Sequence, residues 1–161
     1  MNYTKHFSVN DSTGAVRSLA LKNGMIYCGS KDESLRLYNH NKKQAAGVMS
    51  GHTGTVFKIV DTSKYLISGD DNGHVLIWGH RNKALYHILE TGKHGLLDYD
   101  VHTSEKLLIT IGPESPTSSF YVMKVWNLST CKSIFQKKFK KRISLVKFLP
   151  NNDILLIEGP N

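Results

Sequence analysis

Four copies of one strand pattern follow each other along the 161-residue chain, and this repeat restricts the fold more than any other feature of the sequence. The first large apolar residues of the four copies are Val16, Val56, Leu97 and Ile143, which lie 40, 41 and 46 positions apart. A repeat of roughly 40–45 residues, with about four short strands in each unit, is typical of the blades of a β-propeller. The longest interval contains a Pro- and Ser-rich stretch over residues 112–119, which indicates a surface loop.

Each of the first three units contains a strand that ends in an aromatic residue, over residues 34–38, 74–78 and 122–126. The strands are rich in Val, Ile, Leu, Tyr and Phe and are separated by turns rich in Gly, Asn, Asp and Ser. No segment keeps apolar residues at helical spacing for three turns. The sequence therefore predicts an all-β chain, a single domain of about three and a half blades. Their approximate ranges are residues 10–50, 51–91, 92–139 and an incomplete 140–161.

The expected number of strands is too small for a large closed ring. We expect about fifteen strands, including one near His6 to Val9, whereas seven blades of four strands need about 28. Three explanations remain open. The chain is a fragment, or two copies close a ring as a homodimer, or it forms a small four-bladed ring or an arc that another protein completes.

The second unit carries further motifs. Gly51-His52 opens it, and residues 66–78 follow the pattern Ser-Gly-x-x-Asp-Gly-x-x-x-x-Trp closely. These residues resemble the WD-repeat (WD40) family. The resemblance implies that a His, a Ser or Thr, an Asp and a Trp form hydrogen bonds within each blade. The matching positions here are His52, Ser68, Asn72 and Trp78, with Asp32 and Tyr38 in the first unit and Thr110 and Trp126 in the third. Asn72 stands where Asp is usual, which leaves that contact open.

Loop sequences over residues 27–38, 65–69, 97–108 and 124–128 are similar to those of a narrower family, the WD-repeat proteins named for binding PAK kinases. Its yeast members are known from the maintenance-of-killer phenotype. The resemblance implies a nuclear, mainly nucleolar scaffold in the assembly of the large ribosomal subunit, with cytoplasm as a further location. It also implies an alternative role, as an adaptor that binds and inhibits a PAK-type kinase. A generic protein-binding WD40 scaffold is a third reading.

The charge of the chain bears on its partners. The 21 basic residues exceed the 13 acidic ones by eight, which favours acidic partners such as ribosomal RNA, although solubility alone would also explain the excess. A basic run is the strongest candidate for nucleic-acid contact or nuclear import, with a solvated sheet edge as the alternative. Its members are Lys137, Lys138, Lys140, Lys141 and Arg142. Turn residues expected on the same face are Lys31, Asp32, Glu33, Asp70 and Asp71.

No sequence signature of an enzyme is present: there is no nucleophile elbow, no phosphate-binding loop and no zinc-protease motif. Cys28 and Cys131 are too few for a disulfide framework or a zinc cage. No apolar run approaches the roughly 18 residues of a membrane helix. We therefore expect a non-enzymatic scaffold without catalytic residues, cofactor, metal or membrane partner.

Overall fold

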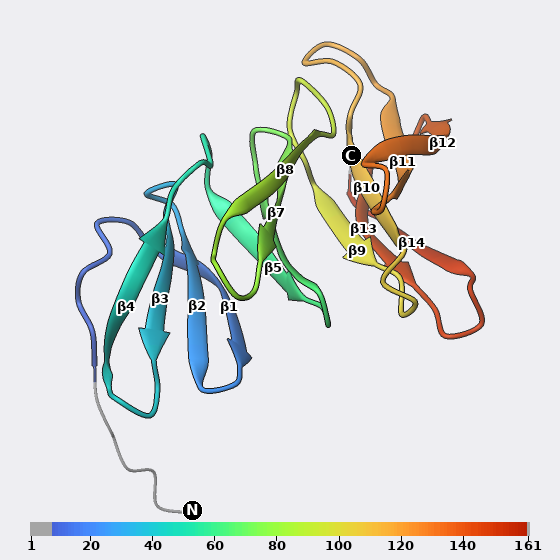
Figure 1. Ribbon diagram of the computed structural model, residues 1–161. Coiled ribbons are helices and arrows are strands. Elements are labelled where there is room, and N and C mark those ends of the chain that lie inside the picture. The colour runs from blue at the N-terminus through green and yellow to red at the C-terminus, as the bar shows by residue number, and fades with distance from the viewer. Residues whose placement is uncertain (1–7, 161) are drawn as a thin grey trace, which may run out of the picture.

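Four separate antiparallel sheets make up the chain (Figure 1). The computed structural model describes residues 8–160, and all fourteen secondary-structure elements in this range are strands. The expected strand near His6 to Val9 begins outside the described residues, and Ser8 and Val9 are not part of a strand. The fold is thus all-β, as the repeat predicts.

Three of the sheets have four strands each, joined in sequence order by short turns. The first sheet, blade 1, contains β1 (Val16–Lys22), β2 (Met25–Ser30), β3 (Leu35–Asn39) and β4 (Gln44–Met49). Blade 2 contains β5 (Val56–Asp61), β6 (Tyr65–Asp70), β7 (His74–Gly79) and β8 (Leu85–Glu90). Blade 3 contains β9 (Asp98–Val101), β10 (Leu107–Pro113), β11 (Tyr121–Asn127) and β12 (Lys132–Phe139). The two strands of blade 4 are β13 (Ile143–Phe148) and β14 (Ile154–Glu158).

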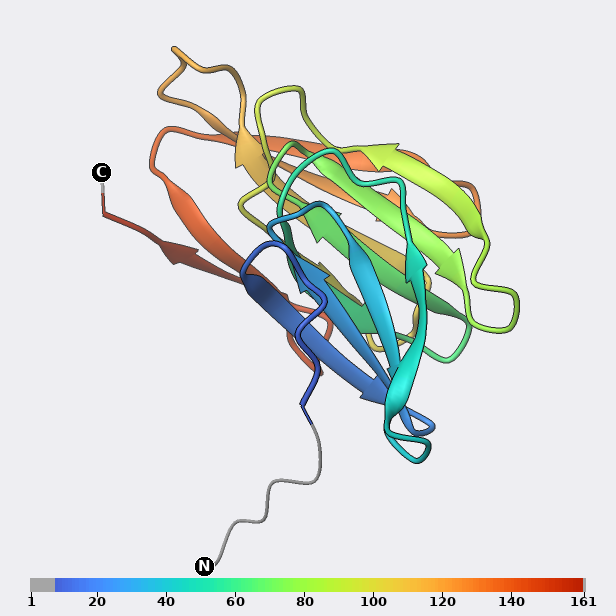
Figure 2. The same cartoon turned by 90° about the vertical axis from the view of Figure 1, so that its left-hand side faces the viewer.

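The four blades lie side by side along an open arc (Figures 1 and 2). Their first strands β1, β5, β9 and β13 lie on the inner side, since β1 contacts β5, β5 contacts β9 and β9 contacts β13. β4, β8 and β12 form the outer edges. This is the arrangement of WD40 propeller blades, three complete and one partial.

Apolar side chains fill the junctions between neighbouring blades. A separate cluster of buried residues lies at each junction. Leu37 and Trp78 belong to the cluster between blades 1 and 2. Ile77 and Tyr99 belong to the cluster between blades 2 and 3, and Met123 belongs to the cluster between blades 3 and 4. Because a blade buries its faces only against its neighbours, the junctions between sheets form the core.

Buried carboxylates add polar links between the inner strands. Asp98 on β9 accepts hydrogen bonds from Lys58 Nζ of blade 2 at 2.7 Å and from the backbone N–H of Val146 on β13 at 2.9 Å. Asp100 accepts from the N–H of Phe148 at 2.9 Å. The two aspartates thereby hold blade 3 to both of its neighbours.

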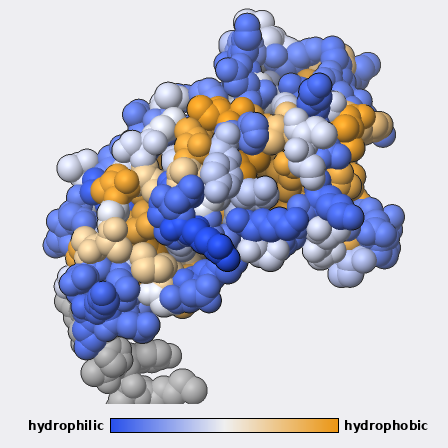
Figure 3. All heavy atoms as spheres, viewed as in Figure 1, coloured by the Kyte–Doolittle hydropathy of each residue, from blue (hydrophilic) through white to orange (hydrophobic). Residues whose placement is uncertain are grey.

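The outer faces of the two end blades have no neighbouring blade within the described residues. Exposed apolar residues gather there, with Leu19 and Leu21 on β1 and Leu155 and Ile157 on β14. Figure 3 shows apolar side chains reaching the surface between polar ones on one side of the molecule. No helix in residues 8–160 is long and apolar enough to cross a membrane.

Candidate functional site

A buried hydrogen-bond network ties the two middle strands of blade 2, β6 and β7, to the loop that precedes the blade. His52 Nε2 lies 2.6 Å from Ser68 Oγ, and the indole N–H of Trp78 donates to the same hydroxyl at 2.7 Å. His52 Nδ1 lies 2.8 Å from Asp70 Oδ2. Since an ionised carboxylate can only accept, Nδ1 carries a proton, and in the neutral imidazole the Ser68 hydroxyl donates to Nε2.

The acidic member of this network differs from the expected one. The WD pattern assigns the carboxylate to position 72. Here Asp70, two residues earlier in the turn, takes that role, because its carboxylate contacts the imidazole of His52. Asn72 instead donates from its side chain to the backbone carbonyl of Thr53 at 2.6 Å. Asp70 is fully buried, so it does not serve as the exposed partner contact that the turn suggested.

The environment of Asp70 favours its charged form. Burial raises the pKa of this carboxyl, but hydrogen bonds from His52 and from the backbone N–H of His74 outweigh burial, and the net pKa is lowered. The carboxylate also accepts from the N–H of Asn72 at 3.1 Å and so closes the turn. Asp70 therefore stabilises both the blade and its β6–β7 turn.

Blades 1 and 3 carry reduced versions of the network. In blade 3 the indole N–H of Trp126 donates to Thr110 Oγ1 at 3.0 Å, while His94, the nearest histidine of this unit in the sequence, is exposed. In blade 1 the Tyr38 hydroxyl donates to Asp11. Asp32 there accepts from the N–H groups of Thr13 at 2.9 Å and Ser34 at 3.2 Å.

Asp32 is thus largely engaged within its own blade. Burial raises its pKa, but hydrogen bonds from Ser34, Arg36 and Thr13 lower it more strongly, which keeps this carboxylate ionised. Its neighbours Lys31 and Glu33 in the β2–β3 turn are exposed. This turn, the β6–β7 turn and the β12–β13 turn lie at the same ends of the strands, which we call the top face.

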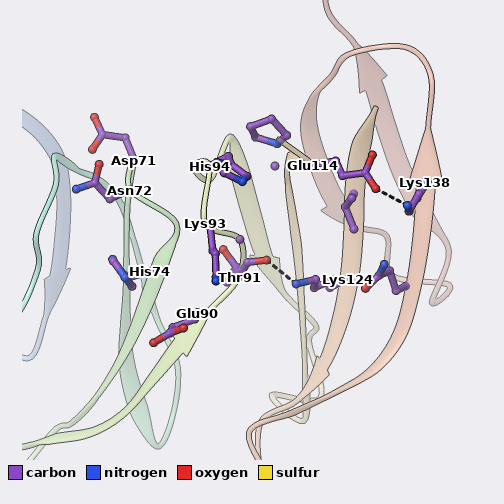
Figure 4. A pocket seen from close by; sticks show the side chains of 16 residues that line it. Asp71, Asn72, His74, Glu90, Thr91, Lys93, His94, Glu114, Lys124 and Lys138 are labelled. Carbon is purple, nitrogen blue, oxygen red and sulfur yellow. Dashed lines mark hydrogen bonds and ion pairs between the residues drawn. The ribbon is translucent and has the colours of Figure 1, made fainter. Parts of the chain in front are cut away.

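A polar cleft of about 790 Å³ opens between blades 2 and 3, and its lining includes β6–β7 turn residues (Figure 4). One wall carries Asp71, His74 and Glu90 from blade 2. Lys124 and Lys138 line it from β11 and β12 of blade 3. The cleft therefore brings together two of the partner contacts expected from the sequence, Asp71 and Lys138, from positions 67 apart in the chain.

Between these walls runs the linker over residues 91–95. Lys124 Nζ donates to the carbonyl of Thr91 at 2.8 Å, and Thr91 itself is anchored by its N–H to the carbonyl of Gly73 at 2.8 Å. Gly73 has a φ of +101°, and a side chain there would collide with the carbonyl of Gly92. Close approach of the linker to the β6–β7 turn therefore depends on this glycine.

The rest of the basic run does not line the cleft. Lys140, Lys141 and Arg142 form the exposed β12–β13 turn, where Lys141 pairs with Glu158 at 2.9 Å. Lys137 Nζ lies 5.4 Å from the ring centre of Phe139. Lys138 pairs with Glu114, and this pair lowers the pKa of the Glu114 carboxyl. The run thus divides between the cleft and the neighbouring top surface.

Sequence reasoning missed the cleft residues Lys93, Glu90 and Lys124. A signal for Lys124 existed, because it lies two residues before Trp126 and so shares a face of the strand with it. Lys93 and Glu90 lie in and beside the connection between two blades, where strand alternation gives no guidance. No group of three His, Cys, Asp or Glu side chains suited to a metal ion occurs in residues 8–160.

Solved structures share this fold. The computationally designed Ika4 protein superposes with a TM-score of 0.78 at 13% identity, covering 98% of this chain and 99% of that chain. A chain of the mitotic checkpoint complex gives a TM-score of 0.76 at 17% identity, over 93% of this chain and 45% of that one. At these identities the likeness concerns the fold alone.

Sequence comparison gives a family match and distant relatives. The model of the "WD domain, G-beta repeat" family matches residues 43–79. The p21-activated protein kinase-interacting protein 1-like of Danio rerio is 28% identical over 149 residues, which cover 91% of this chain and 39% of that protein. Shk1 kinase-binding protein 15 of Schizosaccharomyces pombe is 26% identical over 120 residues, 71% of this chain and 33% of that protein.

Protein MAK11 of Saccharomyces cerevisiae is 21% identical over 123 residues, 66% of this chain and 29% of that protein. The chain thus spans about 39% of the length of the vertebrate relative and less of the two yeast proteins. With the strand topology, these matches show propeller blades with a WD40 repeat over residues 43–79, in a chain similar over most of its length to the p21-activated-kinase-interacting proteins.

Proposed function

We propose that this chain is a non-enzymatic scaffold that binds macromolecular partners through its top face, in the assembly of the large ribosomal subunit. The exposed basic turn Lys140–Arg142 is the observation that carries this proposal. It lies on the top face beside Lys138, in a chain with a net charge of +8. Exposed cationic side chains on a rigid blade suit the phosphates of structured RNA. The nucleolus is the location that this role requires.

The test is salt-dependent binding of a structured ribosomal RNA fragment. Changing Lys140, Lys141 and Arg142 to Gln should weaken binding and reduce the slope of log affinity against log salt by about two to three, because each lost phosphate contact contributes about 0.7–0.9. The control variant changes Lys42, Lys64 and Arg81 to Gln, which removes the same charge from turns at the opposite ends of the strands. Equal effects in both variants would contradict a top-face RNA site.

A second candidate is an adaptor that binds and inhibits a PAK-type kinase. It is favoured by the names of the Danio rerio and Schizosaccharomyces pombe relatives, which describe kinase interaction and kinase binding. Binding to the regulatory segment of such a kinase should depend weakly on salt, unlike RNA binding. Calorimetric titration with that segment at low and high salt would separate the two functions.

A further inference from the structure

The cleft between blades 2 and 3 contains cationic and backbone groups that the described chain leaves without a partner. The side chain of Lys93 is exposed and makes no hydrogen bond or ion pair with residues 8–160. Lys124 faces a carbonyl oxygen rather than a carboxylate. The backbone N–H groups of Gly92, Lys93 and His94 likewise make no hydrogen bond with residues 8–160. Successive free N–H groups beside lysines attract carboxylates.

The other wall of the cleft has the opposite charge. Glu90 is exposed and has no partner among the described residues, and Asp71 uses one carboxylate oxygen to accept from the N–H of Thr55 at 2.7 Å. An acidic group in the cleft is therefore repelled from blade 2 and attracted to the linker and to blade 3. This polarity fixes the side on which an anionic side chain would lie.

The character of the lining distinguishes between classes of ligand. Small-molecule pockets of this volume are mainly apolar, whereas this cleft is lined mostly by charged side chains, amides and glycines. RNA is disfavoured, because no Phe, Tyr or Trp side chain lines the cleft for base stacking. An extended polypeptide satisfies free backbone N–H groups through its own carbonyls and places side chains alternately toward the two walls.

We propose that this cleft binds an extended acidic segment of a partner protein, with its carboxylates at Lys93, Lys124 and the N–H groups of residues 92–94. This site deepens the proposed scaffold function. It is separate from the RNA surface, which depends on Lys140–Arg142. Loss of RNA binding in the Lys140–Arg142 variant would therefore leave the cleft intact, and the two proposals fail independently.

The experiment uses fluorescence anisotropy with a labelled ten-residue peptide of alternating Glu and Ser. Lys93→Ala should raise the Kd about fivefold, the effect of one exposed charge contact. Glu90→Gln should lower it about twofold, because the repelling carboxylate is gone. The matched control Lys132→Ala removes the same charge from an exposed position of β12 outside the cleft and should change the Kd by less than about twofold.

Several results would overturn the proposal. One is equal weakening by Lys93→Ala and Lys132→Ala, which would mean non-specific attraction to a basic protein. Another is equally tight binding of a peptide in which every Glu is Gln. Absence of binding to the wild-type chain at millimolar peptide would also reject the site. A ten-nucleotide oligouridylate that binds through Lys93 more tightly than the peptide would assign the cleft to RNA instead.

Discussion

At the scale of single residues, the carboxylate that contacts His52 comes from a different position of the motif than the WD pattern predicts, while the hydrogen bond itself is retained. The WD pattern places the carboxylate at position 72, but Asp70 supplies it here from the end of β6. The sequence contains both Asp70 and Asp71 before Asn72, and a pattern match alone cannot decide which one faces inward. That choice depends on the turn geometry, in which Asp70 also accepts from the N–H of His74 at 3.0 Å.

The Ser68 hydroxyl is the shared contact of His52 and Trp78, so its removal should destabilise blade 2. Ser68→Ala leaves His52 Nε2 and the indole N–H of Trp78 buried without this partner, and the expected loss is about 1–3 kcal/mol of unfolding free energy. Urea denaturation at neutral pH measures it. Ser129→Ala, in an exposed turn, should change the free energy of unfolding by less than about 0.5 kcal/mol. Comparable losses in both variants would contradict a structural role for the hydroxyl.

Asp70 should also make stability depend on pH. Its folded-state pKa is lowered, whereas an aspartate in the unfolded chain has a pKa of about 4. Its contribution is therefore present above about pH 4 and is lost as the pH falls through the lower folded-state pKa. The difference in unfolding free energy between wild type and Asp70→Asn should be largest near pH 7 and shrink toward pH 3. A difference that is constant from pH 7 to pH 3 would contradict this linkage.

At the scale of secondary-structure elements, β9 is the most constrained strand, because its side chains reach into blades on both sides. Besides the Asp98 contacts, Tyr99 is fully buried and its hydroxyl donates to the carbonyls of Lys58 at 2.8 Å and Ile67 at 3.0 Å. Burial, together with Asp98 and Asp100, raises the pKa of this phenol. The strand therefore joins blades 2, 3 and 4 into one body.

Neutralising either aspartate of β9 should loosen blade 4. Asp98→Asn and Asp100→Asn replace carboxylate acceptors of the Val146 and Phe148 N–H groups, and each should cost about 1.5–3 kcal/mol, the contribution of a hydrogen bond to a charged group. Hydrogen exchange at the β13 amides should accelerate before exchange in blade 2. Asp153→Asn, in the exposed β13–β14 turn, provides the control. Unchanged β13 protection in both β9 variants would refute this role.

The strands were predictable to a degree that the cleft was not. Apolar periodicity and Gly- and Asp-rich turns locate the strands of blades 1 to 3, because the buried positions of each strand are apolar in its own local sequence. A cleft between blades depends on which side chains of two sheets face each other. Glu90 and Lys124 come together through tertiary contacts that no local pattern encodes. The basic run was visible in the sequence, but its division between cleft and turn was not.

At the scale of the whole molecule, the described residues form an open arc whose two end blades each expose an apolar face. Leu19 is 66% and Leu21 is 67% exposed on β1, while their neighbour Ala20 packs toward blade 2. Two copies arranged as a ring would place blade 4 of each against blade 1 of the other. The two-stranded blades would then lie at separate junctions and could not merge into one. Such a ring has eight blade positions, twice the four sheets of one copy.

We expect the isolated chain to self-associate through these end faces, since burying an exposed leucine side chain contributes about 1.5–3 kcal/mol. Light scattering at tens of micromolar should give a mass above the 18.1 kDa of one chain, at low and at high salt alike. Leu19→Glu should restore the monomer mass, because it places a charge on the blade 1 face. Ile88→Glu, on the outer strand β8, should not. A wild-type monomer, or equal effects of both changes, would show that the end faces do not drive association, and a dimer mass would support closure by two copies.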